Sequence, residues 1–375
     1  TGDTRIVTER GLERIDELAS CEEIDLHVLS RDQKVHRASK WFDSVVQPTI
    51  QVTNNKGYHL RGSHNHPVLT WQDGGVTPPG FVWKLLEDIQ MGDVLVMDRS
   101  DALWPTQLLA MEPYHPQRLS PRVQRKILPT HLTRDLAFVL GSLLAEGTLS
   151  HKRLEFCNTD RNWIAGFEQA WHRVFPDCRL HRFERQPSSY GKMPYVRLEI
   201  HSSHVIEFLK NIGLEPNKSP QRRIPKAIFK SPKSVAAIFA QAFFEGDGTI
   251  TFSERVVQLG IVSSSEGLIH DFQVLMLRFG LDTFKRFDRG RGTFTLHTRG
   301  VPNYRRFKNE IGFFSQRKQE KLETVLQTFS VASSKTDFVP FLSTSLRGLV
   351  RQTSQERLLN RYNFDRYPAM ARNGA

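Results

Sequence analysis

Two acidic residues stand at equivalent points of a repeated pattern and are the strongest candidates for chemistry in this sequence. Glu146 and Asp247 each end an apolar segment, and a glycine, Gly147 or Gly248, follows each acid. We expect each glycine to take the left-handed conformation that closes a helix. Each acid would then lie at the negative end of a helix dipole, where a carboxylate is disfavoured. Such acids need a compensating cation.

Small residues one turn apart predict that the two helices pack closely. Gly141 and Ala145 have this spacing in the first helix, and Ala242 and Gly246 have it in the second. Close packing would bring the two acids together. Neighbouring carboxylates suit a hard divalent cation such as Mg²⁺. The pattern therefore predicts metal-dependent phosphodiester hydrolysis, with both acids as metal ligands.

The region around the acids is an internal repeat. Most landmarks recur after 99 to 105 residues: Ile164 as Ile269, Phe183 as Phe287 and Gly213 as Gly312. Each copy predicts a helix, two hairpins with a helix between them, and a final helix. We expect Thr133 to cap the first helix, and Ser231 with Pro232 to begin the equivalent helix of the second copy. Two such copies imply pseudo-twofold symmetry, which is the symmetry of duplex DNA.

Residues 139–147 (VLGSLLAEG) and 240–248 (AQAFFEGDG) resemble the two motifs of a single-chain LAGLIDADG homing endonuclease. The resemblance covers residues 131–328 and implies two αββαββα halves. It also implies that the last acid of each motif binds a divalent metal at the scissile phosphates. The first motif departs from the pattern, with Leu144 at the inner acid and Glu146 in place of aspartate.

Two lysines occupy matching places in the copies. Lys218 follows Glu146 by 72 residues, and Lys318 follows Asp247 by 71 residues. Similarity to intein endonucleases implies that a lysine near this point of each half reaches the active site. There it could polarise the attacking water or stabilise charge on phosphorane oxygens. The alternative is that these lysines contact only phosphate or solvent.

The second hairpin of each copy predicts a DNA-reading surface. Polar and apolar residues alternate through residues 195–201 and 291–299, so one face can pack while the other enters the major groove. An ordinary solvated strand face is the alternative for any one residue. The predicted DNA-binding residues are Arg179, His181, Tyr195, Arg197, Lys285, Arg286, Arg289, Arg291, Thr293, Thr295, His297 and Arg299.

Charge is unevenly distributed along the 375 residues. Residues 1–100 contain 11 Lys and Arg against 15 Asp and Glu, a net charge of −4, whereas the remainder has 41 against 25, a net charge of +16. A positive field on one part of the chain favours a polyanionic partner, with nucleic acid ahead of a membrane surface. The longest apolar run, 136–145, is too short to span a membrane.

The three cysteines form no CxxC pair, which argues against a disulfide framework and a thiolate zinc site. We therefore expect a monomer in a reducing cytoplasm, at DNA, without a membrane partner.

Residues 1–99 predict an all-β unit of short strands, including 41–46 and 49–53. Five prolines alternate with basic residues in 101–130, which we interpret as a basic linker or DNA-binding arm. Residues 1–7 and 61–69 (RGSHNHPVL) resemble blocks of an intein splicing (Hint) domain. This resemblance implies splicing roles for Ser63 and His66, and Asp365 lies nearest to the histidine position of the penultimate block.

The expected fold is α+β. Residues 1–100 and 329–375 form a split Hint domain around an endonuclease with halves at 131–230 and 231–328. The expected function is an intein-encoded homing endonuclease that cuts both strands of a long DNA target with Mg²⁺ or another divalent cation, within host exteins. We expect the sequence as given not to splice, because the terminal residues needed for splicing are absent. A catalytically inactive nucleic-acid-binding protein of the LAGLIDADG fold and a purely self-processing Hint protein are the alternatives.

Overall fold

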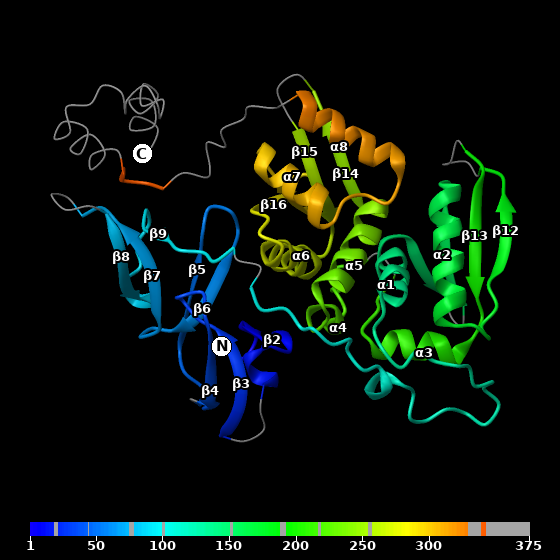
Figure 1. Ribbon diagram of the computed structural model, residues 1–375, viewed down its shortest axis with the longest axis horizontal. Coiled ribbons are helices and arrows are strands. Elements are labelled where there is room, and N and C mark those ends of the chain that lie inside the picture. The colour runs from blue at the N-terminus through cyan, green and yellow to red at the C-terminus, as the bar shows by residue number, and fades with distance from the viewer. Residues whose placement is uncertain are drawn as a thin grey trace.

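The structure is a computed structural model that describes residues 1–18, 22–43, 45–74, 79–99, 102–150, 153–187, 193–216, 219–253, 257–328 and 339–342. An N-terminal unit of strands lies beside a larger region of helices and sheets (Figure 1). The predicted α+β class is confirmed. Lys218, Asp365 and most of residues 329–375 lie outside the described residues. None of the described helices is long and apolar enough to cross a membrane.

The N-terminal unit contains three small antiparallel sheets and short 3-10 turns. Their strand orders are β2-β1-β3-β4, β5-β6 and β8-β7-β9. The predicted strand at 41–46 is wrong, because the strand that pairs with β3 lies at 35–40 instead. The strands are β1 (Arg5–Thr8), β2 (Gly11–Arg14), β3 (Glu23–Leu29), β4 (Val35–Lys40), β5 (Thr49–Thr53), β6 (His59–Ser63), β7 (Pro67–Gln72), β8 (Gly80–Leu85) and β9 (Val94–Leu95).

The larger region consists of two halves with the same order of elements, as the internal repeat predicted. The first half contains α1 (Arg134–Glu146), β10 (Gly147–Ser150), β11 (Arg153–Asn158), α2 (Arg161–Val174), β12 (His181–Arg185), β13 (Tyr195–Ile200), α3 (Ser203–Asn211) and the short α4 (Lys226–Phe229). The second contains α5 (Lys233–Gly246), β14 (Gly248–Phe252), β15 (Val257–Ser263), α6 (Glu266–Arg278), β16 (Thr283–Asp288), β17 (Thr293–Thr298), α7 (Val301–Glu310) and α8 (Gln316–Thr328). The sheet orders, β10-β11-β13-β12 and β14-β15-β17-β16, are equivalent.

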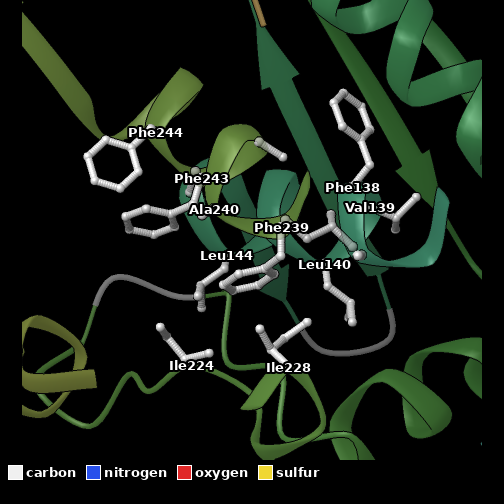
Figure 2. Close-up of a cluster of buried hydrophobic side chains, with 14 of the residues drawn as sticks. Phe138, Val139, Leu140, Leu144, Ile224, Ile228, Phe239, Ala240, Phe243 and Phe244 are labelled. Carbon is white, nitrogen blue, oxygen red and sulfur yellow. The ribbon is translucent and has the colours of Figure 1, made fainter. Parts of the chain in front are cut away.

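Helices α1 and α5 pack against each other at the centre of the two halves. Both helices are apolar around most of their circumference, which is typical of helices buried on more than one side. Figure 2 shows side chains of both helices meeting, with Phe239 and Leu144 among them and Ile228 of α4 nearby. This shared core fixes the ends of the two helices relative to each other.

The beginnings of the two helices differ from each other. Thr133 caps α1 as predicted, because its hydroxyl accepts a hydrogen bond from the backbone N–H of Leu136 at 3.2 Å. The predicted cap at Ser231 is wrong. Its hydroxyl donates to the Ile228 carbonyl at 2.7 Å, and Pro232 takes the N-cap position of α5 without a side-chain cap.

Residues 102–132 form a packed strap along both halves (Figure 1, cyan). Near its start, the carbonyls of Ala102 and Leu103 accept hydrogen bonds from Arg278 of α6. Near its end, the backbone N–H of Lys126 donates to His204 of α3 at 2.8 Å. Met111, within the strap, is completely buried. The segment predicted as a linker or arm therefore also holds the two halves together.

The N-terminal unit is attached to the second half by polar contacts. Arg5 of β1 forms an ion pair with Asp271 of α6 at 2.8 Å, and the Asp271 side chain is 1% exposed. The tip of the β5–β6 hairpin reaches β16, where the Lys56 carbonyl accepts from the N–H of Lys285 at 2.9 Å. The described part of the C-terminal region also returns to this unit, because Trp71 donates to the Pro340 carbonyl at 2.9 Å.

Candidate functional site

The structure brings Glu146 and Asp247 to the adjoining C-terminal ends of α1 and α5. Glu146 is the last residue of α1, and Asp247 follows the last residue of α5, Gly246. A Cβ atom placed on Gly246 would lie 2.6 Å from the Cβ of Ala145 and 3.0 Å from the Cγ of Glu146. Only glycine permits this approach, as the small-residue spacing predicted.

The glycines after the two acids do not close the helices in the way we expected. Gly147 has φ −78° and ψ 151°, which is extended backbone, and Gly248 does not have a positive φ either. The prediction of a left-handed conformation is wrong because each glycine begins a strand. Glycine is nevertheless required there, since a Cβ would overlap the carbonyl oxygen of Leu143 or Phe244, four residues earlier.

Lys318 lies at the C-terminal end of α5, as its spacing predicted. Its ammonium donates to the carbonyls of Phe244 at 3.1 Å and Gly248 at 2.9 Å, and to that of Glu245. An ammonium has three protons, so these three acceptors use all of them. In this arrangement Lys318 satisfies carbonyls at the helix end, and a direct role in catalysis stays a prediction.

Glu245 is a buried residue of this site that the sequence reasoning missed. Its Oε2 accepts hydrogen bonds from the backbone N–H groups of Phe314 at 3.0 Å and Ser315 at 2.9 Å. Its Oε1 lies 3.9 Å from the Lys318 ammonium. Glu245 therefore holds the loop that presents Lys318. The sequence signal was its place at the inner acid of the second motif, where the first motif has Leu144.

Arg222 is a second residue that the sequence reasoning missed. Its guanidinium donates to the carbonyl of Leu144 and, at 3.4 Å, to Oδ2 of Asp247. Equal spacing from the two acids had selected Lys218, whereas Arg222 follows Glu146 by 76 residues. The loop that follows α3 is longer than its counterpart in the second half, so counting alone could not identify the residue that reaches the helix end.

Burial changes the proton affinities of both cations. It lowers the pKa of Lys318, and the charges of Glu245, Glu146 and Asp247 oppose this shift in part. Burial also lowers the pKa of Arg222, against the opposing influence of Asp247 and Glu146. The two acids thus lie within electrostatic reach of both cations, one from each half of the repeat.

The donor set at the two helix ends fits a hard divalent cation that is shared with a substrate. The described residues contain no group of three or more His, Cys, Asp or Glu side chains that could hold a metal ion by themselves. Mg²⁺ usually keeps several waters and is bound by one or two carboxylates together with substrate phosphates. Glu146 and Asp247 supply two such carboxylates.

In the first half, the predicted DNA-binding residues lie on one face of the sheet. Antiparallel partners share a face, and the pairs His181–Glu199 and Arg185–Tyr195 belong to the face opposite to the buried Val196 and Leu198. We call this surface the open face. Arg197 also lies on it and forms an ion pair with Glu199 at 2.8 Å. Arg179 is exposed just before β12.

In the second half, the equivalent open face contains Thr295, Thr293, His297 and Arg286. Exposed arginines extend it at 289, 291 and 299. Lys285 does not join this face. It pairs with the buried Leu296 across the sheet, and its ammonium lies 3.1 Å from Glu266 of α6. Strand alternation accounts for the difference, because neighbouring residues of a strand point to opposite faces.

The residues with predicted splicing roles lie at the end of β6. Ser63 is the last residue of this strand, and its carbonyl accepts from the backbone N–H of His66 at 3.0 Å. The Thr1 hydroxyl donates to the Arg61 carbonyl of the same strand at 3.3 Å. The first residue of this sequence therefore lies beside the block that contains Ser63 and His66.

Residues 234–312 match the family described as LAGLIDADG-like domain. This range covers most of the second half, from α5 through α7. The second half therefore contains a LAGLIDADG-like domain, and the first half repeats its order of elements.

Several relatives match over nearly the whole chain. A DNA gyrase protein of Mycolicibacterium flavescens is 29% identical over 94% of this chain and 59% of its own length. Replicative DNA helicase DnaB of Rhodothermus marinus is 23% identical over 81% of this chain and 30% of its own length. Replication factor C small subunit of Methanocaldococcus jannaschii is 24% identical over 87% of this chain and 17% of its own length. The chain thus spans less than two thirds of each of these relatives.

Solved structures with a similar arrangement include I-DmoI in complex with DNA and Mn, at 13% identity over 48% of this chain and 97% of that chain, with a TM-score of 0.36. Full-length DUF199/WhiA from Thermatoga maritima is similar at 14% identity over 66% of this chain and 76% of that chain, with a TM-score of 0.37.

Proposed function

We propose that this chain is an intein-encoded, site-specific DNA endonuclease that uses a divalent cation to hydrolyse both strands of a duplex. The observation that carries the proposal is the meeting of Glu146 and Asp247 at the ends of α1 and α5, in a domain with two open sheet faces. Neighbouring carboxylates at two negative helix ends are unfavourable unless a cation joins them. The LAGLIDADG-like match supports the same chemistry.

The pattern of relatives supports an origin as an insert in a host protein. A gyrase, a helicase and a replication factor have different names and lengths, yet each matches 81% to 94% of this chain with only 17% to 59% of its own length. A segment that is shared by otherwise different proteins is what a mobile insert produces. We infer that residues 1–100 and 329–375 form the splicing unit that holds the endonuclease.

The residues of the chain would divide the work of hydrolysis. A divalent cation, when bound, would lower the pKa of a coordinated water and offset charge on the scissile phosphate. Glu146 and Asp247 would hold it, each from the end of one motif helix. Lys318 and Arg222 satisfy the carbonyls at those ends and keep the acids in place. The open faces, with Arg197 and Arg286, would bind the duplex on either side.

The decisive experiment compares Asp247→Asn and Glu146→Gln with the wild-type chain. Targets would come from selection of bound duplexes out of a randomised library, followed by cleavage in Mg²⁺. Each variant should cut at least about 100-fold more slowly, because loss of metal-ligand charge removes several kcal/mol of transition-state stabilisation. Affinity for the duplex should change by less than about threefold, since neither acid lies on an open face. A variant that cuts at the wild-type rate would refute the metal assignment.

The splicing assignment has its own test. The chain would be extended with a cysteine-initiated start and a His-Asn end and placed between two host segments. Ligated host product that disappears on His66→Ala would support residues 1–70 as part of a Hint domain, because the imidazole would protonate the scissile amide. A junction that forms no thioester, as judged by mass spectrometry, would contradict it.

A further inference from the structure

Arg222 joins the ends of the two motif helices. Its Nη2 donates to the Leu144 carbonyl at the end of α1 and lies 3.4 Å from Oδ2 of Asp247 at the end of α5. Its side chain is 3% exposed, and that of Asp247 is 13% exposed. A buried guanidinium is costly unless its acceptors compensate for the lost water. One buried cation therefore depends on acceptors from both halves.

The pseudo-twofold symmetry shows what Arg222 replaces. Leu144 and Glu245 are equivalent, since each lies two residues before an acid. Arg222 donates to the carbonyl of Leu144, and Lys318 donates to that of Glu245. Arg222 thus has in the first half the position that Lys318 has in the second.

The two cations differ in the carboxylate that balances them. Lys318 has the Glu245 carboxylate of its own half at 3.9 Å. The first half has apolar Leu144 at the equivalent place, so it offers no such carboxylate there. The guanidinium of Arg222 instead approaches Asp247 of the other half. The missing inner acid of the first motif therefore couples Arg222 to the predicted metal ligand of the second.

The backbone around Arg222 is fixed from the second half. The Ser265 hydroxyl, at the start of α6, donates to the Arg222 carbonyl at 2.7 Å. The next residue, Arg223, makes two hydrogen bonds of 2.7 Å to the carboxylate of Asp271, which also accepts from the N–H of Ile224 at 3.1 Å. These contacts leave Arg222 little freedom to move away from Asp247.

We propose that Arg222 is a positioning residue that orients the Asp247 carboxylate and makes tight cation binding depend on DNA. Without DNA, the guanidinium competes with a divalent cation for the same carboxylate and repels it. A DNA phosphate adds negative charge at the site and offsets this repulsion. The inference rests on the proposed function only where it refers to cleavage. Its effect on cation binding can be measured without a DNA target.

The test uses terbium(III) as the cation probe, with luminescence sensitised by tryptophan. Trp163 lies beside the site, since a Cβ on Gly246 would be 2.9 Å from its Cη2. Arg222→Gln should bind terbium about tenfold more tightly than wild type in the absence of DNA, because a nearby positive charge is removed. The same variant should cut DNA about tenfold or more slowly in Mg²⁺. Asp247→Asn defines the signal without the site.

Arg223→Gln is the matched control, because it removes the neighbouring arginine without touching Leu144 or Asp247. It should keep wild-type terbium affinity. Arg222→Lys restores the charge with a single donor nitrogen, so it should bind terbium as wild type does and still cut more slowly. This variant also serves if the glutamine variant does not fold, and cutting at the wild-type rate would then overturn the proposal.

Unchanged terbium affinity in Arg222→Gln, or an equal change in Arg223→Gln, would also overturn the proposal. Tighter terbium binding in a chain whose wild type cuts no selected duplex would support the positioning role and refute the endonuclease function. Normal cutting by the wild type with no terbium effect in Arg222→Gln would refute the positioning role alone.

Discussion

At the scale of single residues, the two acids behave differently from the cations that surround them. Glu146 and Asp247 were identifiable because each ends a repeated motif before a glycine. Lys318 was found by its spacing from Asp247, and the structure places it at the end of α5. Its side chain is 12% exposed, and burial among carbonyl oxygens lowers its pKa. The residue therefore has a structural task whatever else it does.

Lys318→Met should destabilise the fold by about 1 to 3 kcal/mol. The substitution keeps the aliphatic stem but leaves buried carbonyls at the end of α5 without a donor. Urea unfolding of the full chain, followed by tryptophan fluorescence, measures the effect. Lys321→Met is the control, because Lys321 is exposed on the same helix and should change stability by less than about 0.5 kcal/mol. Equal losses in both variants would contradict the capping role.

Arg222 shows why some residues of the site could not be predicted from the sequence. A repeat supplies equivalent positions only where the copies have equal lengths. The segment between Gly213 and Arg222 is longer than the one between Gly312 and Lys318. Which side chain then reaches the helix end depends on the path of the loop, and that path is set by contacts such as Ser265 with the Arg222 carbonyl. These contacts are distant in sequence.

At the scale of elements, close approach of α1 and α5 determines the geometry of the site. Small residues at helical spacing were a sufficient signal, because the steric limit on helix separation is local to the contact. Strand positions at 49–53 were also predicted correctly from alternation. The strand at 35–40 was missed because its sequence, VHRASK, is largely polar, and its residues are mostly exposed. A polar edge strand has little periodic signal.

Gly246→Ala should separate the two motif helices and destabilise the protein by about 1 to 3 kcal/mol. The new methyl group would overlap Ala145 and the ring of Trp163, and well-packed helices cannot absorb it without moving. The same movement should slow cleavage by changing the separation of the acids. Thermal unfolding and a cleavage time course measure both effects. Gly80→Ala, where no atom lies within 4 Å of the new Cβ, should leave both unchanged.

At the scale of the whole molecule, the N-terminal unit and the second half share a polar interface. His59 of β6 stacks on His270 of α6, with ring centroids 4.5 Å apart. Burial lowers the pKa of His270 to about 4, and the charges of His59, Lys285 and Arg5 add to the effect while Asp271 opposes it. The sequence could not predict this pairing, because the two rings come from units that are far apart in the chain.

Stability should fall as the pH decreases from about 6.5 to about 4. In this range an unfolded His270 binds a proton and the folded one does not, so protons favour unfolding. A pKa near 4 against 6.5 for an ordinary histidine corresponds to a loss of about 3 kcal/mol at the acid end. Urea unfolding at several pH values measures the slope, and His270→Phe should reduce it. His172→Phe, on the exposed surface of α2, should not.

Binding to duplex DNA should depend steeply on salt. Each phosphate neutralised contributes about −0.9 to the slope of log affinity against log salt. The open faces and residues 101–130 supply the basic residues, whereas residues 1–100 have a net charge of −4. Fluorescence anisotropy between about 50 and 200 mM salt measures the slope for the full chain. Combined Arg286→Gln and Arg291→Gln should make it shallower by about 2, while Arg37→Gln should not. A flat response would contradict an electrostatic interface.

The buried carboxylate of Asp271 has a consequence for transplanting this domain into another carrier. Arg5 of the N-terminal unit and Arg223 of the first half both bind it, and it is 1% exposed. A graft that omits the N-terminal unit would uncover this acid and remove one of its two counter-charges. A designer who wants a portable nuclease module should therefore carry β1 with it or neutralise the acid as Asp271→Asn. Cargo and carrier in this chain have become chemically interdependent at one carboxylate.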